Sequence, residues 1–331
     1  MSHVSAIRLV VTACALGWTG AVAASGLIFY DAATGMKSVE ASAASPLELW
    51  RPRLNDVGEI VWQQQLTFAP NTFAIFSNVR GQLAVGAVAD PDINNLGEVI
   101  WRFGDGGSGQ NGIESNVKGV ILLSSGQDPY YDTQRLNNLG EVVATRNGGV
   151  QGVWSNERGY LPTLGQIARE TEINDIDEVV YQSYDNIAGE SYFRIQSTVR
   201  GTVSASDWAT VPDINNLGEI VWQQSIRPSG NGPHWEIWSN LRGKIGNGEQ
   251  PSINDLGEVV WQFWDGSDYE IYSSVRGQIT SNDEQDEWPQ VNNRGDIVWK
   301  QSGVPIAPEP SSILFATCAL PITLGRLRRG A

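Results

Sequence analysis

The stretch Ile214-Asn-Asn-Leu-Gly218-Glu-Ile-Val-Trp222 dictates the architecture, because it occurs with small changes seven times in the 331 residues. The copies follow one another at intervals of 37 to 43 residues, at 54–62, 93–101, 136–144, 173–181, 214–222, 253–261 and 291–299. Repetition with a period of 20–50 residues is typical of solenoids and propellers, in which each repeat is one supersecondary unit. The chain is therefore expected to be a repeat protein.

Each copy is predicted to be a β-hairpin turn followed by a strand. Asparagine favours the first turn position because its side chain bonds the backbone two residues on, and glycine accepts the positive φ that closes the turn. The run that follows, Glu219–Gln223 in the fifth copy, is rich in β-branched and aromatic residues, as strands are. Five copies carry a proline two residues before the first aliphatic residue, which predicts the start of the preceding strand there. These prolines are Pro52, Pro91, Pro212, Pro251 and Pro289.

A second repeated element, such as Ser239-Asn-Leu-Arg-Gly243, alternates with the first and reads as another hairpin turn with glycine in its left-handed position. Its copies occupy 77–81, 115–119, 155–159, 197–201, 239–243 and 273–277, with a divergent seventh at 28–35. Two hairpins in about 40 residues give four strands, and radially repeated four-stranded sheets are propeller blades. We expect an all-β, seven-bladed β-propeller of four-stranded blades over 24–302. An open β-solenoid is the alternative.

The strand Ile220-Val221-Trp222 supports this fold, because it is apolar on both of its alternating faces. A sheet stacked between two neighbours needs such strands, whereas a sheet with one exposed face alternates with polar residues. The tryptophans at this position are therefore interpreted as packing residues between sheets, although a sugar-stacking ladder is the other reading. The acidic residue after each glycine, such as Glu219, is likewise interpreted as structural, because an enzyme needs one site and not seven.

The N-terminal 23 residues predict a cleavable signal peptide with a helical apolar segment. Arg8 precedes an apolar run from Leu9, which ends in the small-x-small sequence Ala21-Val22-Ala23. The run is shorter than the roughly 20 apolar residues that span a bilayer. We expect cleavage by signal peptidase and export across the inner membrane.

The C-terminal segment 303–331 is predicted to be a linker and a sorting tail. Pro308-Glu309-Pro310-Ser311 opens the motif 308–312, and an apolar segment predicted to be helical follows at 313–325. The basic end 326–329 contains Arg326, Arg328 and Arg329. Arginines after an apolar segment stay in the cytoplasm, which places the preceding domain outside.

This order of Pro-Glu-Pro, apolar segment and arginines resembles the PEP-CTERM tail of exosortase-sorted proteins in Gram-negative bacteria. The resemblance implies transient retention in the membrane through the C-terminal segment and recognition of Pro308, Glu309 and Pro310 by an exosortase-type enzyme. It also implies a final location in the cell envelope, at the surface or outside the cell. Because exosortase systems accompany exopolysaccharide production, exopolysaccharide or envelope proteins are the expected partners.

Composition further reduces the range of functions that the chain can have. The formal net charge is −15, and removing the arginine-bearing terminal segments makes the domain more acidic, which argues against nucleic acid as a partner. Cys14 and Cys318 lie in the terminal segments, so the repeat domain holds no disulfide. His234 is the only histidine between these segments, and no metal-spaced His/Cys cluster or catalytic motif accompanies it. The prediction leans away from an enzyme and names no catalytic residue.

Candidate ligand-binding residues come from the connections that differ between repeats. Tyr184, Trp235 and Trp264 lie in or beside these connections, which leave the repeats on one face. The acidic run Asp283–Glu287 reads as a solvated loop, and the loop that starts at Asp92 lacks an oxygen ligand where a calcium loop needs one. No metal site or cofactor is therefore predicted, with calcium left open.

Three functions follow from the sequence. The first is an exported, non-enzymatic propeller that binds or scaffolds extracellular polysaccharide or protein. The second is a carbohydrate-active enzyme, a glycosidase or lyase that uses acidic residues on the propeller face. The third is a purely structural surface protein.

Overall fold

The computed structural model describes residues 23–44, 47–104, 110–124, 130–147, 152–165, 167–226 and 234–303, and all regular structure in them is β. The predicted signal helix before Ala23 and the predicted sorting tail at 308–329 lie outside the described residues. Within the described part, no helix is long and apolar enough to cross a membrane.

The strands form antiparallel sheets of consecutive neighbours. Four sheets contain four strands that follow one another in the chain. The first contains β10 (Tyr130–Leu136), β11 (Val142–Asn147), β12 (Gly152–Ser155) and β13 (Gly159–Leu161). The second contains β14 (Ile167–Ile173), β15 (Val179–Ile187), β16 (Glu190–Ser197) and β17 (Gly201–Thr202). The third contains β18 (Ala209–Ile214), β19 (Ile220–Ile226), β20 (His234–Ser239) and β21 (Gly243–Asn247). The fourth contains β22 (Glu249–Ile253), β23 (Val259–Trp264), β24 (Tyr269–Ser273) and β25 (Gly277–Gln278).

One sheet has seven strands because a single long strand serves two repeats. Its strands are β3 (Leu49–Leu54), β4 (Ile60–Phe68), β5 (Asn71–Ser77), β6 (Gly81–Ile93), β7 (Val99–Gly104), β8 (Asn111–Ser115) and β9 (Gly119–Ser124). The first half of β6 pairs with β5 up to Gly86, and the second half pairs with β7 from Ala87 onward. β6 is thus the fourth strand of one repeat and the first strand of the next.

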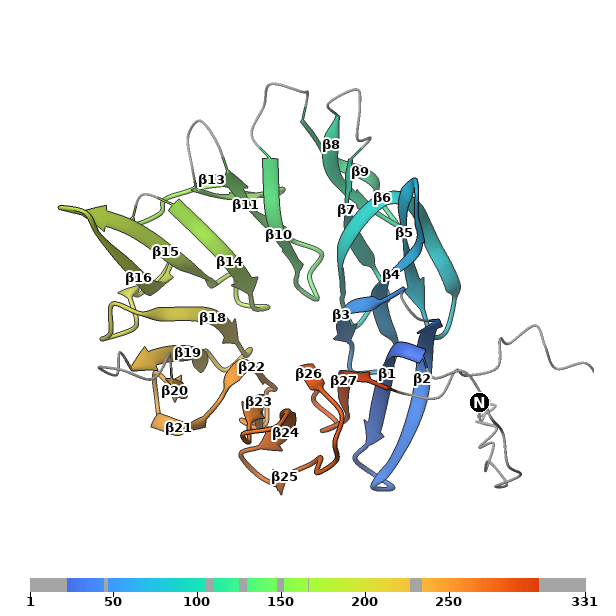
Figure 1. Ribbon diagram of the computed structural model, residues 1–331. Coiled ribbons are helices and arrows are strands. Elements are labelled where there is room, and N and C mark those ends of the chain that lie inside the picture. The colour runs from blue at the N-terminus through green and yellow to red at the C-terminus, as the bar shows by residue number, and fades with distance from the viewer. Residues whose placement is uncertain are drawn as a thin grey trace, which may run out of the picture.

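The remaining sheet joins the two ends of the domain. Its order is β2 (Met36–Ala44), β1 (Ala23–Asp31), β27 (Ile297–Ser302) and β26 (Asp286–Val291). Ile28 of β1 lies opposite Trp299 of β27. The divergent seventh hairpin predicted at 28–35 is therefore the outer half of this sheet. Because the first and last strands pair, the sheets stand around a common centre (Figure 1), unlike the open solenoid that was the alternative.

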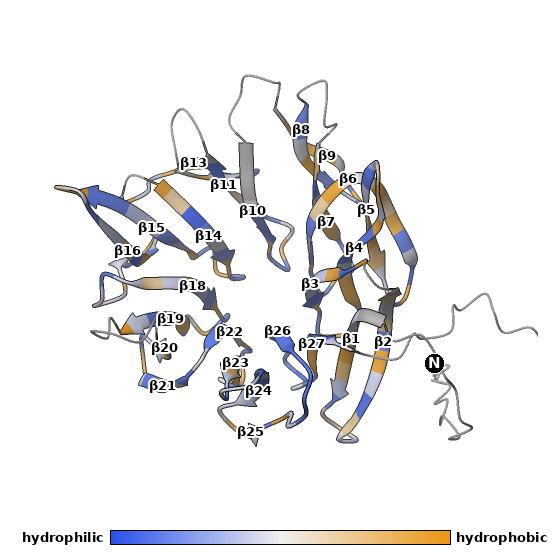
Figure 2. Cartoon of the chain, in the orientation of Figure 1, coloured by the Kyte–Doolittle hydropathy of each residue, from blue (hydrophilic) through white to orange (hydrophobic). Residues whose placement is uncertain are grey.

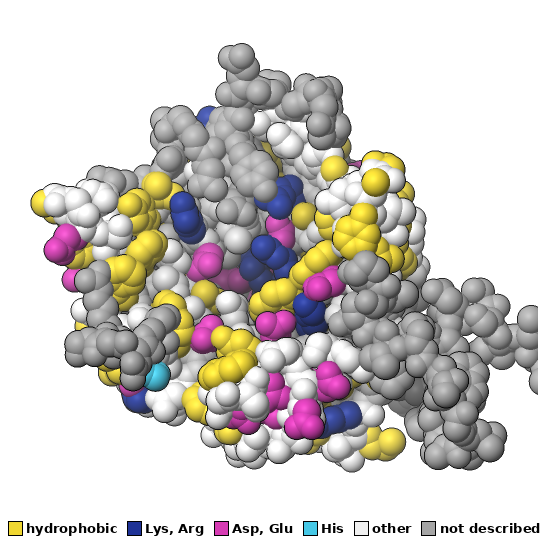
Figure 3. Space-filling model, viewed as in Figure 1, with side chains coloured by type: hydrophobic (Ala, Val, Ile, Leu, Met, Phe, Trp, Pro, Cys, Tyr) yellow, Lys and Arg dark blue, Asp and Glu magenta, His cyan; other side chains and the backbone are white. Residues whose placement is uncertain are grey.

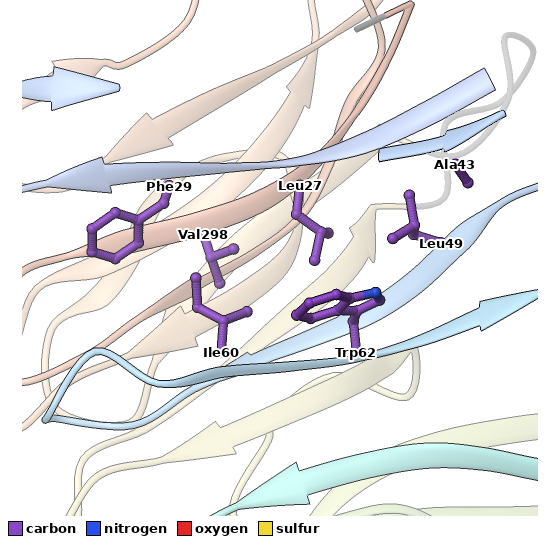
Figure 4. Packing of buried hydrophobic residues seen from close by; sticks show 7 residues of the cluster. All are labelled: Leu27, Phe29, Ala43, Leu49, Ile60, Trp62 and Val298. Atoms are coloured by element: carbon purple, nitrogen blue, oxygen red, sulfur yellow. The ribbon is translucent and has the colours of Figure 1, made fainter. Parts of the chain in front are cut away.

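The core consists of separate apolar layers between neighbouring sheets, not one common centre. Ile220 and Val221 have no exposed surface, and Trp222 is 4% exposed, as strands buried on both faces require. Figure 4 shows one such layer, in which Leu27, Phe29 and Val298 of one sheet pack against Ile60 and Trp62 of the next. Hydrophobic residues are accordingly spread over the strands of all sheets (Figure 2). The interpretation of the repeated tryptophans as packing residues is confirmed at these positions.

The repeated Asn-x-x-Gly turn also links each repeat to the next. In each turn the Oδ1 atom of asparagine accepts bonds from the backbone two and four residues on, as Asn55 does from Val57 N (3.2 Å) and Glu59 N (2.8 Å). The Nδ2 atom donates to the carbonyl of the equivalent asparagine in the next repeat at 2.9–3.2 Å. The last of these bonds runs from Asn292 to Asn55 O (3.0 Å), so the seven bonds form a closed ring. The ring members are Asn55, Asn94, Asn137, Asn174, Asn215, Asn254 and Asn292.

The acidic residue after the turn glycine ties the two kinds of hairpin together. Glu219 accepts from Ser239 Oγ (2.5 Å) and from Arg242 Nε (2.6 Å), both from the Ser-Asn-x-Arg-Gly turn of the same sheet. The same pairing recurs at Glu59, Glu98, Glu141, Glu178 and Glu258. These glutamates are buried and paired, so their structural interpretation is confirmed and they are not candidates for catalysis.

Candidate functional site

The sheets stand around a central axis. The repeated turns and the variable connections lie at opposite ends of this axis, because of the direction in which the strands run. The innermost strand of each repeat, which is its first strand, ends at the Asn-x-x-Gly turn. The third strand runs in the same direction and ends at the Ser-Asn-x-Arg-Gly turn. All repeated turns therefore lie on one face, hereafter the turn face. The connections between second and third strands, which vary from repeat to repeat, lie on the opposite face, hereafter the loop face. A depression marks the axis at each end.

The depression on the turn face is lined by a second polar ring. Its members are the residues after the ring asparagines: Asp56, Asn95, Asn138, Asp175, Asn216, Asp255 and Asn293. Each Oδ1 accepts from the backbone N–H of the residue before it in the ring, at 2.7–2.8 Å. The three carboxylates are never adjacent, and each accepts from two flanking amide groups. Because its polar atoms satisfy one another, we assign this ring to structure.

The depression on the loop face, hereafter the axial pocket, has a volume of about 240 Å³. Charged side chains gather around the centre of the face in Figure 3. The pocket is lined by three arginines and four carboxylates: Arg51, Arg53, Arg135, Asp90, Glu170, Glu172 and Asp213. Trp288 and five prolines supply its apolar wall. The pocket therefore offers donors, acceptors and one aromatic ring within a small space.

The rim of the axial pocket is built from strained backbone. One residue of each innermost strand has φ between +22° and +56° although it is not glycine, and a break in pairing register marks every one of these positions. Left-handed φ is disfavoured for residues with a Cβ, most of all for a β-branched residue such as Val211. The seven rim residues are Arg51, Asp90, Thr133, Glu170, Val211, Gln250 and Trp288.

In five of the seven strands, a proline follows the rim residue in the sequence. The prediction that this proline marks the start of the strand was wrong. Pro212 lies within β18, at the break between Thr210 and Asp213, and does not mark the start of the strand. Proline is accepted at a bulge because no ladder hydrogen bond is required there. The bulge turns the preceding residue toward the axis, which the sequence alone could not reveal.

Below the rim, most of the charged residues form ion pairs or hydrogen bonds within the protein. Glu172 receives Arg135 Nε (2.5 Å) and Arg53 Nη2 (3.2 Å), which come from two other sheets. Asp213 accepts from Ile214 N (2.8 Å) with one oxygen and from Ile253 N (2.8 Å) of the next sheet with the other. Burial, together with the nearby charge of Glu172, raises the pKa of Asp213 to about 7. Asp92 makes the equivalent bond to Leu136 N (2.8 Å), and burial raises its pKa as well.

The three residues predicted from the sequence to bind ligand lie on the loop-face ends of their strands but outside the axial pocket. Tyr184 packs against Phe193 of its own sheet, with ring centroids 5.2 Å apart. Trp264 packs edge-on against Tyr269 at 5.3 Å and is 46% exposed. Trp235 is half-buried in β20. They belong to three different sheets, and neither depression on the axis is lined by any of them.

The acidic run Asp283–Glu287 is only partly the solvated loop that was expected. Asp286 is completely buried and accepts from Trp299 Nε1 (2.8 Å) and Gln301 Nε2 (2.8 Å). Desolvation raises its pKa to about 6, against the lowering influence of these hydrogen bonds. Asp286 is drawn into the interior because the buried N–H of Trp299 needs an acceptor there.

These observations define the class of the protein: an all-β repeat protein with a propeller scaffold and a charged axial pocket. No family model matches the chain, and no curated protein is similar to it in sequence. Among solved structures, the orthorhombic form of Pyrococcus horikoshii acylaminoacyl peptidase aligns over 75% of this chain and 48% of its own, with 12% identity and a TM-score of 0.56. The uncomplexed form aligns over 77% and 52%, with 12% identity and a TM-score of 0.55.

The chain thus spans about half the length of those peptidase chains. A TolB-like protein from Agrobacterium tumefaciens aligns over 86% of this chain and 99% of its own, with 10% identity and a TM-score of 0.47. At such identities the likeness to the peptidase chains concerns the fold alone.

Proposed function

We propose that this chain is an exported, non-enzymatic, seven-bladed β-propeller that binds extracellular polysaccharide through the axial pocket on its loop face. The seven blades are supported by the seven Asn-x-x-Gly turns and by the closed ring of seven asparagine bonds. The export and the sorting are supported by the segments 1–23 and 308–329 of the sequence.

One observation carries the assignment of the binding site to the axial pocket. The asparagine, glycine and glutamate of the repeat keep their identity because they do the same structural work in each sheet. The rim position keeps its strained backbone in all seven innermost strands, yet its side chain is different each time. Contacts within the fold account for some of these side chains, since Glu170 accepts from Val211 N (2.8 Å) and Asp90 pairs with Arg51 and Arg102. They do not account for a different residue at every rim position, and backbone strain clusters at ligand-binding sites. We infer that the rim side chains are chosen for a ligand.

The chemistry of the pocket fits one unit of a sugar chain. Its volume of about 240 Å³ is below the roughly 300–1,000 Å³ of pockets that enclose drug-sized ligands. The half-buried ring of Trp288 can cover the apolar face of a sugar, while the amide group of Gln250 can exchange hydrogen bonds with its hydroxyl groups. Arg51 and Glu170 stand beside them, paired with Asp90 and with Val211 N. A terminal unit or a short side branch would enter, and the longer chain would lie across the loop face.

The glycosidase or lyase alternative receives less support from the same pocket. Such an enzyme needs two carboxyl groups that are free to exchange a proton or to attack. Both oxygens of Asp213 are held by backbone N–H groups, and Glu172 is held by two arginines. Their roles in joining sheets account for their presence. Release of reducing ends from a bound polysaccharide would nevertheless favour the enzyme.

The test is a glycan-array experiment with the purified wild-type chain and two single variants, Trp288→Ala and Trp264→Ala. The proposal expects saccharide binding that falls at least about tenfold in Trp288→Ala and stays within about twofold in Trp264→Ala. The opposite order would move the site to the residues predicted from the sequence. Absence of glycan binding by the folded chain would exclude polysaccharide as its ligand and leave protein scaffolding.

Export and sorting are tested separately by cell fractionation. Replacement of Pro308, Glu309 and Pro310 by alanine is expected to leave the unprocessed chain in the inner membrane. An unchanged distribution between fractions would exclude the exosortase-type route.

A further inference from the structure

The hairpin between β23 and β24 holds a carboxylate cluster away from the axial pocket. Asp265, Asp268 and Glu270 each present one carboxylate oxygen, and these three oxygens lie within 4.8 Å of one another. The sequence Asp265-Gly-Ser-Asp-Tyr-Glu270 brings them together because the loop turns at Gly266, where φ is +117°, and returns Glu270 opposite Phe263.

Two members of this cluster are buried with an unused oxygen. Asp268 is 3% exposed and Glu270 is 1% exposed, and neither Asp268 Oδ2 nor Glu270 Oε2 has a hydrogen-bond partner among the described residues. The other oxygens are engaged: Ser267 Oγ donates to Asp268 Oδ1 (2.8 Å), and Asn282 N donates to Glu270 Oε1 (2.8 Å).

The contrast with the repeated glutamates is informative. Glu258 of the same sheet has an arginine 3.0 Å away, whereas no lysine or arginine in the described part of the chain forms an ion pair with Asp265, Asp268 or Glu270. Buried carboxylates that face one another without a cation are strongly unfavourable, because the charges repel and neither is solvated. A positive charge at the point where the three oxygens converge would remove this penalty.

We propose that Asp265, Asp268 and Glu270 bind a divalent cation, and that the cation is calcium. All three ligands are hard oxygens, which Ca²⁺ and Mg²⁺ prefer, while zinc sites use mainly nitrogen and sulfur. Two ligands on opposite sides of Ca²⁺, at about 2.4 Å each, are about 4.8 Å apart. Three oxygens that lie within 4.8 Å of one another are therefore close enough to share one such ion. Mg²⁺ usually keeps several waters and is bound through one or two carboxylates, whereas Ca²⁺ takes about 6–8 oxygen ligands in a flexible geometry, so three protein carboxylates favour Ca²⁺. Water at the exposed Asp265 would complete the coordination shell.

The cation would fasten two parts of the loop face together. Glu270 already accepts from the backbone of Asn282, in the connection that leads from β25 to β26. Asn282 Nδ2 in turn donates to the buried Asp286 (2.8 Å), which holds Trp299. Calcium at the hairpin would therefore be connected, through Glu270, Asn282 and Asp286, to the sheet that joins the two ends of the domain. We expect the bound ion to stabilise the whole domain and not the hairpin alone.

The experiment compares the full exported chain with Asp268→Asn, and with Glu157→Gln as the matched control. Both variants lose one negative charge, but Glu157 is exposed in a turn on the opposite face. Calcium affinity is measured by isothermal titration after treatment with EDTA, and thermal unfolding is followed with and without millimolar Ca²⁺. Terbium gives a second readout, because Trp264 and Tyr269 lie beside the cluster and can sensitise its luminescence.

The proposal expects calcium to raise the melting temperature of the wild type and of Glu157→Gln by a few degrees. Asp268→Asn should weaken binding at least about tenfold, since even outer-shell changes weaken metal sites about 10–100-fold. In EDTA the same variant should be at least as stable as the wild type, because it removes a repulsive charge. A purely structural role would instead lower its stability in both buffers. That result, or no response of the folded wild type to Ca²⁺ and Tb³⁺, would overturn the proposal.

Discussion

The alternation of acid and amide in the ring on the turn face predicts a large effect of one isosteric substitution, Asn216→Asp. Asn216 Nδ2 donates to Asp175 Oδ2 (2.9 Å) and to Asp255 Oδ2 (3.0 Å), so the variant would place three carboxylates in a row. A hydrogen bond to a charged group contributes roughly 1.5–3 kcal/mol. The ring is only half-buried, so we use the lower value, and the loss of two bonds amounts to about 3 kcal/mol. Repulsion between the carboxylates adds to this, for an expected loss of about 3–5 kcal/mol at pH 7.

Asn138→Asp is the matched control, because Asn138 donates to only one carboxylate, Asp175 (2.8 Å), and has Asn95 on its other side. Its expected cost is about half as large, near 1.5–2.5 kcal/mol. Urea denaturation at pH 7 measures both free energies of unfolding. Repeating it near pH 4 should restore part of the lost stability, because the protonated carboxyl group of Asn216→Asp no longer repels its neighbours and donates one hydrogen bond in place of two. Equal costs for the two variants, or a loss that persists in acid, would refute the reasoning.

Three further predictions rest on single sites. Asp177 stands where the other repeats have glycine, and it is exposed with φ of +64°. Asp177→Gly should therefore stabilise the domain by roughly 0.5 kcal/mol, as measured by thermal unfolding. A decrease in stability would show that the carboxylate of Asp177 has a structural role. Trp299→Ala removes a completely buried ring between sheets and should cost at least about 3–5 kcal/mol, whereas Trp264→Ala at an exposed ring should cost less than about 1 kcal/mol; similar values would contradict the inter-sheet packing. Burial raises the pKa of Asp286 to about 6 from 3.8, so the folded state binds the proton more tightly and stability should fall as pH rises from about 4 to 6, by up to about 3 kcal/mol. Urea unfolding in EDTA across this pH range measures the free energy of unfolding of the wild type and of Asp286→Asn. If the two free energies changed with pH in parallel, this prediction would be contradicted.

Much of the fold could be predicted from the sequence because its determinants are local. An asparagine and a glycine three residues apart specify a turn, and the apolar run Ile220-Val221-Trp222 specifies a strand covered on both faces. The seven-fold repetition of these signals made the structural reading of Glu219 and Trp222 credible. The first and last strands could not be paired from the sequence, because their partners lie at opposite ends of the domain.

The axial pocket could not be predicted, because its residues are far apart in the chain and are ordinary one by one. Arg53, Arg135 and Glu172 meet only where three sheets converge on the axis. Pro212 gave a signal, but its meaning depended on a bulge inside the strand and not at its end. The sequence directed attention to Tyr184, Trp235 and Trp264 since aromatic residues in variable loops are conspicuous, whereas the structure distributes them over separate sheets.

The repeating unit, its turns and its apolar strands therefore follow from the sequence without further information, because they depend on conformational preferences and spacing within about 40 residues. Which polar groups satisfy one another, and which do not, is set by the packing of the sheets alone. Asp286, expected in solvent, is buried and fully bonded, while Asp268 and Glu270 are buried with an oxygen left over. The reason is that the free energy of a charged group depends on its burial and its partners, and both are set by segments that the chain brings together only on folding.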